Sequence, residues 1–319
     1  MEKDLCGKLY LADNERYADL INGLLLHGEQ LVTPKDLQEL DGQTFGGSRF
    51  KKKHAYRQLY RDLVKKVVFG MNFVVIGTEN QSNVHYVMPQ RCMAEDAAEY
   101  DGQLRRIGKK VRRMKGVSRA EYLSGFRKED RLQPCITIVL YYGECWDGPR
   151  SLHELLNFQE IPPQLREYIN DYPIHVFEIG KLENTEVFRT DLKQVFDFIR
   201  CSKDKDRLRD LVQKDEAFQN MEEDAYDMAV AYAGAEELLA VKKYRGKDGR
   251  INMCKGLADW IADERQQGIE QGIEQGMQAF VLDNLEEGVE TWRIEEKLVK
   301  RFGLSGEDAK KFVEKIMNK

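Results

Sequence analysis

The chain of 319 residues lacks the sequence patterns of several large protein classes. Its six cysteines form no Cys-x-x-Cys pair and no zinc-binding spacing, which favours free thiols in a reducing compartment. No apolar run approaches the roughly 18 residues of a membrane-spanning helix, and the first residues are too polar for an export signal. We therefore expect a cytoplasmic protein that does not cross a membrane.

Three common catalytic motifs are missing as well. The sequence has no Gly-x-x-x-x-Gly-Lys-Ser/Thr loop for nucleotide phosphates, no Gly-x-Ser-x-Gly elbow and no His-Glu-x-x-His zinc motif. The net charge is -5, so the whole protein is not a polycation that would attract nucleic acid through its overall charge. Any affinity for nucleic acid must come from local basic patches.

The pattern of apolar residues predicts an α/β fold. Hydrophobic residues make up 42% of the sequence, which is enough to build a core. Helices and strands are mixed in the first part of the chain, an order that predicts a mixed β-sheet core flanked by helices. The predicted elements are helices at 13–31, 34–40 and 91–114, strands at 62–69, 73–81, 134–143 and 172–182, and helices through most of the region after residue 184.

The chain is predicted to have three regions. We expect residues 1–205 to form the core domain, 206–253 a helical extension and 254–319 a helical C-terminal region. Within the last region, residues 265–278 (RQQGIEQGIEQGMQ) repeat every four positions and contain three glycines. Because each glycine costs about 1 kcal/mol in a helix interior, this segment is predicted to be a marginal helix or a hinge. The C-terminal helical region is also where we expect the contact of any homo-oligomer.

Acidic and amide side chains stand where an apolar hairpin ends. Strand side chains alternate between faces, so Glu79 and Gln81 share one face at the end of the second strand. A hairpin would bring Asp62, at the start of the first strand, toward the same place. Because Mg²⁺ binds a few carboxylate oxygens and otherwise keeps its waters, this cluster is a candidate magnesium site. The alternative is that Asp62 and Glu79 are solvated charges at strand ends.

Two basic segments are candidate contacts for the phosphates of a nucleic acid. The residues concerned are Arg105, Lys109, Arg112 and Arg113 on the predicted helix 91–114, and Lys51, Lys52 and Lys53 before the hairpin. The first four follow i, i+4, i+7, i+8 spacing and form one stripe, and phosphate contacts give affinity without sequence choice. The alternative is a solvated helix face. On the same helix, Glu95, Asp96 and Asp101 are expected to be solvated.

An aspartate followed by a strand, with a Glu-x-Gln at the end of the next strand, resembles the PD-(D/E)xK nuclease superfamily. Within it, the chain resembles the recombination-promoting nucleases, a transposase-like family, over roughly residues 9 to 240. The repeat of Gly-Ile-Glu-Gln near the C-terminus is also typical of that family. The matching segments are NERYADLINGLLLHGEQL (14–31), YRDLVKKV (60–67), IGTENQSNVHYVMPQR (76–91), AAEYDGQL (97–104) and ITIVLYYGECWDGPRSLHELL (136–156).

This resemblance implies a restriction-endonuclease-like core and a role for each matching residue. Asp62 and Glu79 would bind a catalytic Mg²⁺, which Mn²⁺ could replace, and the backbone carbonyl of Asn80 would add an oxygen. Glu15 matches an acidic residue that many superfamily members keep near the metal, or else it is a partner for the positive end of its helix dipole. Gln81 stands where the superfamily has a catalytic lysine, and its amide can orient groups only through hydrogen bonds.

The function that the resemblance implies is Mg²⁺-dependent cleavage of DNA with low sequence specificity, associated with recombination or mobile-element-like activity. The metal would polarise the scissile phosphate and lower the pKa of a bound water for in-line attack. DNA is therefore the expected partner. The alternative is a weak or inactive relative that acts as a DNA-binding or oligomerising protein.

Overall fold

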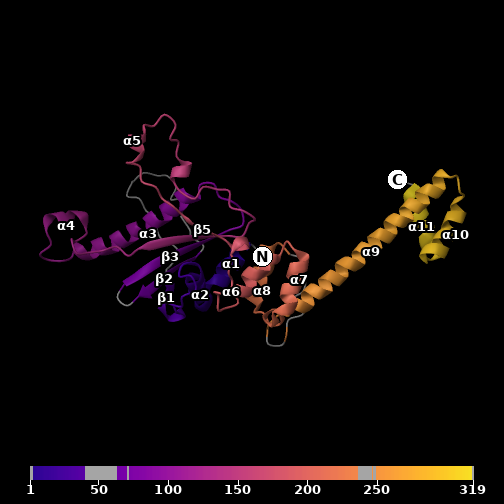
Figure 1. Ribbon diagram of the computed structural model, residues 1–319, viewed down its shortest axis with the longest axis horizontal. Helices are drawn as coiled ribbons and strands as arrows, with labels where there is room; N and C mark the ends of the chain where they lie inside the picture. Colours follow the sequence, from indigo (N-terminus) through magenta and orange to yellow (C-terminus); the bar gives the residue numbers. More distant parts are fainter. Residues whose placement is uncertain (1–2, 40–62, 70–71, 236–245, 247–248, 318–319) are drawn as a thin grey trace. The chain divides into compact units, whose positions relative to one another are not determined.

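The computed structural model describes residues 3–39, 63–69, 72–235, 246 and 249–317 (Figure 1). The chain divides into two compact units, Met1–Cys254 and Lys255–Lys319. The first unit contains a β-sheet with its flanking helices, and the second consists of helices. None of the helices in the described ranges is long and apolar enough to cross a membrane.

Five strands of the described residues form one mixed sheet in the first unit. They are β1 (Leu37–Glu39), β2 (Leu63–Phe69), β3 (Asn72–Gln81), β4 (Cys135–Tyr141) and β5 (His175–Glu178). The strands lie in chain order, with antiparallel pairing from β1 to β3 and parallel pairing from β3 to β5. This mixed sheet confirms the predicted α/β architecture.

The predicted hairpin is formed by β2 and β3. Its register begins with Leu63 opposite Thr78, and both strands are rich in valine, whose branched side chain packs well on a pleated surface. On its other side, β3 pairs with the apolar strand β4 as far as Gln81 opposite Tyr141. The hairpin thereby carries Glu79 toward the end of a strand that has a neighbour on each side.

Helices cover both faces of this sheet. The helices of the first unit are α1 (Lys3–Ala12), α2 (Asn14–Leu24), α3 (Met88–Val111), α4 (Arg119–Ser124), α5 (Pro163–Arg166), α6 (Leu192–Cys201), α7 (Lys205–Lys214) and α8 (Glu223–Ala233), with 3₁₀ turns η1 (Pro34–Asp36), η2 (His153–Leu155), η3 (Ile179–Lys181) and η4 (Glu216–Gln219). On one face, α1 and α2 pack against β2 and β3, and α6 and α8 pack on these two helices. On the other face, α3 packs against β4 and runs on to α4 (Figure 1).

Local signals explain where the helices near the candidate site begin. Asp13 caps α2, because its Oδ1 accepts hydrogen bonds from the backbone N–H groups of Glu15 at 2.9 Å and Arg16 at 3.0 Å. The helix α3 begins at Met88, three residues before the predicted start. Pro89 lies in its first turn, where a backbone N–H has no partner within the helix.

The segment at 34–40 differs from its prediction. Only Pro34–Asp36 forms a helical turn, and Leu37–Glu39 pairs with β2 as the edge strand β1. Three residues are too few for apolar alternation to reveal a strand. The pairing partner, which is far away in the sequence, decides the conformation here.

The described part of the second unit consists of three helices and the short connections between them. The helices are α9 (Met253–Glu286), α10 (Thr291–Phe302) and α11 (Gly306–Met317). α9 continues without interruption through the glycine repeat at 265–278, whereas α10 ends at Gly303, which takes a left-handed φ of 73°. Their shared apolar core contains Met277, Val281, Ile294, Leu298, Ala309 and Val313.

Candidate functional site

Glu79 is fully buried on the face of β3 that α3 covers, with an exposed fraction of 0%. The neighbouring Thr78 points the other way, because its Oγ1 lies 2.9 Å from the hydroxyl of Tyr17 on α2. Adjacent strand residues alternate between faces, so Glu79 points toward the α3 side. A buried carboxylate needs a positive partner or a set of hydrogen bonds to remain charged.

Arg91, on the first turn of α3, supplies a positive charge to this carboxylate. Its Nη2 lies 2.7 Å from Oε2 of Glu79. Its Nε donates a hydrogen bond to Oε1 of Glu95, one turn along the same helix, at 3.1 Å. The side chain of Arg91 is 30% exposed, whereas both carboxylates are buried. One guanidinium therefore joins a carboxylate of the sheet to a carboxylate of the helix.

The burial of Glu95 and Asp96 shows that the prediction of solvated side chains is wrong for both. Asp96 accepts a hydrogen bond from Oγ1 of Thr137 on β4 at 2.7 Å. Both acidic residues fall three or four positions after the buried Cys92, so they continue the stripe that α3 packs against the sheet. This spacing is a signal that the sequence contained. Asp101, in contrast, is exposed as predicted.

Asn80 and Gln81 complete β3 on opposite faces. The side chain of Asn80 is buried, and its Oδ1 accepts a hydrogen bond from the hydroxyl of Tyr142 at 3.1 Å. Gln81 is half-buried, and its backbone carbonyl accepts the N–H of Tyr142 at 2.9 Å. By the alternation of the strand, the amide of Gln81 lies on the side of the sheet where Glu79 and Arg91 meet.

Four of the residues proposed from the sequence, Asp62 and the three lysines Lys51, Lys52 and Lys53, lie outside the described residues. The first described residue of β2, Leu63, pairs with Thr78, which directly precedes Glu79. Within the described ranges, no three His, Cys, Asp or Glu side chains are grouped so that they could hold a metal ion together. Of the three proposed metal ligands, the structure describes Glu79 and Asn80.

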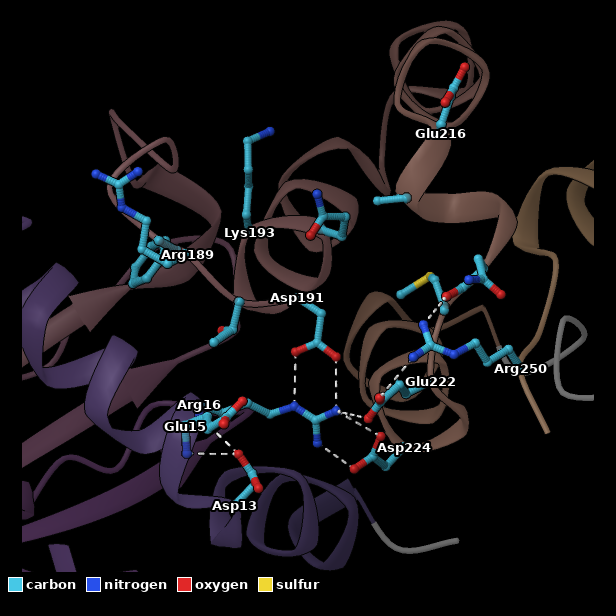
Figure 2. Close-up of a pocket in the computed structure, with 16 residues that line it drawn as sticks. Asp13, Glu15, Arg16, Arg189, Asp191, Lys193, Glu216, Glu222, Asp224 and Arg250 are labelled. Carbon is cyan, nitrogen blue, oxygen red and sulfur yellow. Dashed lines mark hydrogen bonds and ion pairs between the residues drawn. The ribbon is translucent and has the colours of Figure 1, made fainter. Parts of the chain in front are cut away.

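The structure does not bring Glu15 to the face that carries Glu79. Glu15 is exposed in the first turn of α2, and α2 packs on the Thr78 side of the sheet. Its position agrees with the alternative of a partner for the positive end of the helix dipole. Glu15 also borders a cavity of about 1050 Å³, together with residues of α6, α8 and η4 (Figure 2).

Arg16, beside Glu15, is the centre of a charge cluster in this cavity (Figure 2). Its Nε and Nη2 donate to the two carboxylate oxygens of Asp191 at 2.9 and 2.8 Å, and Nη2 also lies 2.9 Å from Glu222 and 3.0 Å from Asp224. Burial alone lowers the pKa of Arg16, but the hydrogen bonds with Asp224 and Asp191 outweigh it and raise the pKa above its ordinary value. The sequence could not reveal this cluster, because the partners are 175 to 208 residues away.

The four basic residues proposed as phosphate contacts at the end of α3 are all exposed. Arg105 forms an ion pair with Asp101 at 3.0 Å. Lys109, Arg112 and Arg113 form no ion pair with another described residue. The helix ends three residues earlier than predicted, so the last two of these residues follow it instead of extending its stripe.

His85 lies in the connection between β3 and α3, where its backbone carbonyl accepts the first N–H of α3. Burial and then the positive charge of Arg91 lower the pKa of His85 below its ordinary value. A lowered pKa favours the neutral imidazole in the folded protein. The pKa of His85 is therefore sensitive to the charge of Arg91, although burial is the larger cause of its shift.

Comparison with known proteins assigns no family to the chain, which matches no protein-family model, no curated protein and no solved structure.

Proposed function

We propose that the protein is a Mg²⁺-dependent DNA endonuclease of low sequence specificity, built on a restriction-endonuclease-like core. The observation that carries this proposal is the fully buried carboxylate of Glu79, on a strand of a mixed sheet and in contact with a cationic side chain. Apolar residues of similar volume often stabilise a core as well as a buried ion pair does. A carboxylate retained in such a place therefore supports a functional role.

The donor atoms around Glu79 fit a hard divalent cation. Mg²⁺ prefers carboxylate and carbonyl oxygens, which Glu79 and the backbone of Asn80 offer. The carboxylate of Glu95 contacts the same guanidinium as Glu79, so two buried acidic side chains meet at this place among the described residues. Asp62 would be the second carboxylate, in the role that the family resemblance implies. Mn²⁺ takes the same kind of ligands and is expected to substitute.

When bound, the metal ion would polarise the scissile phosphodiester and lower the pKa of a coordinated water. Gln81 would orient the phosphate or the attacking water through its amide, which can donate and accept hydrogen bonds. Because this amide cannot take up a proton, we expect slower hydrolysis than at a site with a lysine in its place.

The DNA would be held by the basic end of α3. Lys109, Arg112 and Arg113 are exposed and unpaired among the described residues, so their charges are available to phosphates. Contacts of this kind position a duplex but carry no sequence information. Low sequence specificity follows if these are the main DNA contacts.

A plasmid-nicking assay tests the proposal. The wild-type protein with Mg²⁺ or Mn²⁺ should convert supercoiled plasmid to nicked and linear forms, and EDTA should stop the reaction. Glu79→Gln should lose at least about 100-fold in rate, because it removes the charge that binds the metal. The matched control is Glu99→Gln, which changes another buried carboxylate of the α3 side that is paired with an arginine, Arg106. Equal activity of wild type and Glu79→Gln would contradict the site assignment.

The second candidate function is DNA binding without cleavage. It is favoured by the ion pair that already occupies Glu79 and by the presence of Gln81 where the superfamily has lysine. This candidate predicts a gel shift with plasmid or duplex DNA that is unaffected by EDTA and by Glu79→Gln. It also predicts no nicking with any divalent metal.

A further inference from the structure

The two ion pairs that Arg91 forms with described residues are of different kinds. One is to Glu79 of β3, through Nη2 at 2.7 Å, and the other is to Glu95 of α3, through Nε at 3.1 Å. The second attachment lies within one helix turn, so it survives any small shift between the helix and the strand. The first crosses from the helix to the sheet and depends on their relative position.

Arg91 and a divalent cation would compete for the same carboxylate. Mg²⁺ needs an oxygen at about 2.1 Å and an octahedral shell of further oxygens around it. A guanidinium in contact with Oε2 of Glu79 takes up part of that space, and its positive charge repels a second cation in a partly desolvated site. Binding of metal at Glu79 therefore requires Arg91 to withdraw from it.

We propose that Arg91 is an exchangeable counter-ion of Glu79, which the metal displaces and which then contacts a phosphate of the DNA. This inference rests on the proposed function. Before metal binding, Arg91 compensates the buried charge of Glu79. After displacement, Glu95 keeps the guanidinium beside the site through Nε. The two Nη groups can then donate to a phosphate oxygen in the bidentate manner that arginine favours.

The exposure of Arg91 supports the exchange. Its side chain is 30% exposed, whereas Glu79 is 0% exposed and Glu95 is 2% exposed. Part of the Arg91 side chain is therefore in contact with solvent, whereas its two carboxylate partners are buried.

Binding of Mn²⁺ alone to the full-length protein, measured by titration calorimetry or by electron paramagnetic resonance, tests the proposal. Arg91→Met removes the competitor, so its Kd for Mn²⁺ should fall at least about tenfold below that of wild type, equivalent to about 1.4 kcal/mol. Arg91→Lys, which keeps the charge but not the two-point contact, should fall between the two. Arg106→Met is the matched control, because Arg106 pairs with the buried Glu99 on the same helix at 3.1 Å and should leave the Kd unchanged.

The rate of DNA cleavage should change in the opposite direction to the affinity for metal. At saturating Mn²⁺, Arg91→Met should cleave plasmid about 100-fold more slowly, as expected when a donor to the reacting phosphate is removed, although it binds the metal more tightly. Arg91→Lys keeps the inference testable if Arg91→Met does not fold.

Two results are distinguishable. If Glu79→Gln abolishes Mn²⁺ binding while the Arg91 variants bind Mn²⁺ like wild type, Arg91 is not a counter-ion that the metal displaces and only this inference fails. If wild type itself neither binds Mn²⁺ nor cleaves DNA, the proposed function fails together with it.

Discussion

The hydroxyl of Tyr17 lies 2.9 Å from Oγ1 of Thr78 and donates a hydrogen bond to the backbone carbonyl of Ile76 at 3.0 Å. Tyr17 is completely buried between α2 and β3. These contacts fix which face of β3 meets α2. Because neighbouring strand residues alternate, they also determine that Glu79 faces α3 and not α2.

Tyr17→Phe should therefore destabilise the first unit by about 1–3 kcal/mol, because a buried polar group of the strand loses its partner. Urea unfolding followed by tryptophan fluorescence would measure the change. Tyr168→Phe is the control, since the side chain of Tyr168 is 83% exposed and its hydroxyl can bond to water. Equal stability of Tyr17→Phe and wild type would mean that the hydroxyl contacts do not hold the two elements together.

Arg16 should be important for the stability of the layer formed by α2, α6 and α8. Arg16→Met leaves the carboxylates of Asp191, Glu222 and Asp224 without their shared cation, and we expect a loss of about 3 kcal/mol. This value is the lower end of the range for buried pairs, because the acids are 25% to 53% exposed.

The control for Arg16→Met is Lys214→Met. Lys214 pairs with Asp210 on the surface of α7, where an ion pair contributes less than about 1 kcal/mol. Similar losses of stability in the two variants, measured by urea unfolding, would contradict the central place of Arg16 in the cluster.

The local parts of this fold were predictable from the sequence, and the contacts that join its layers were not. Apolar, valine-rich runs predicted the β2–β3 hairpin, and the cap of α2 by Asp13 involves only the next three residues. Such signals act over a few residues. The edge strand β1 escaped prediction because only its pairing with β2 makes it a strand.

The same limit applies to the candidate site. Glu79 and Gln81 could be placed on one face from strand alternation alone. The ion pair of Glu79 with Arg91 depends on how α3 packs across the sheet, which apolar spacing does not specify. The burial of Glu95 was visible in principle, because it lies three residues after the buried Cys92.

The pKa of His85 should lie below the ordinary value of about 6.5 for histidine. NMR titration of the imidazole protons would measure it directly. In Arg91→Met the pKa should rise, because the repulsion by a nearby positive charge disappears, but it should not recover fully, because burial is the larger cause. An unchanged pKa in this variant would mean that Arg91 does not act on His85.

Stability should follow the same titration. The unfolded chain binds a proton on His85 more readily than the folded chain does. The stability that neutral His85 contributes is therefore fully present above about pH 6.5, and it is lost as the pH falls through the lowered pKa of the folded state. His85→Gln should show a flatter fall in urea stability between neutral and acidic pH. If the two curves are parallel, His85 contributes nothing to the pH dependence.

The basic end of α3 should determine the salt dependence of DNA binding. Replacing Arg105, Lys109, Arg112 and Arg113 by Ala should weaken binding and reduce the slope of log K against log salt by about 0.9 for each phosphate that the variant no longer neutralises. Arg105 should contribute least, because Asp101 already neutralises it.

A control of equal charge is available on α7. Replacing Lys205, Arg207, Arg209 and Lys214 by Ala removes four positive charges from exposed positions of another helix. A similar change in slope for both variants, measured by fluorescence anisotropy over a salt series, would mean that overall charge and not the end of α3 controls binding.

The glycines of α9 allow a test of what the repeat contacts. A Cβ added at Gly268, Gly272 or Gly276 meets no described atom within 4 Å, so replacement of all three by Ala should stabilise the helix by about 1 kcal/mol for each substitution. Hydrogen exchange of residues 265–278 would measure the gain.

Gly23→Ala is the contrasting control in α2, where the new Cβ would lie 2.2 Å from the ring of Phe188 and should destabilise the fold. If the triple variant is no more stable, or less stable, the glycines face a close partner, which is the arrangement that a homo-oligomer contact through α9 would require.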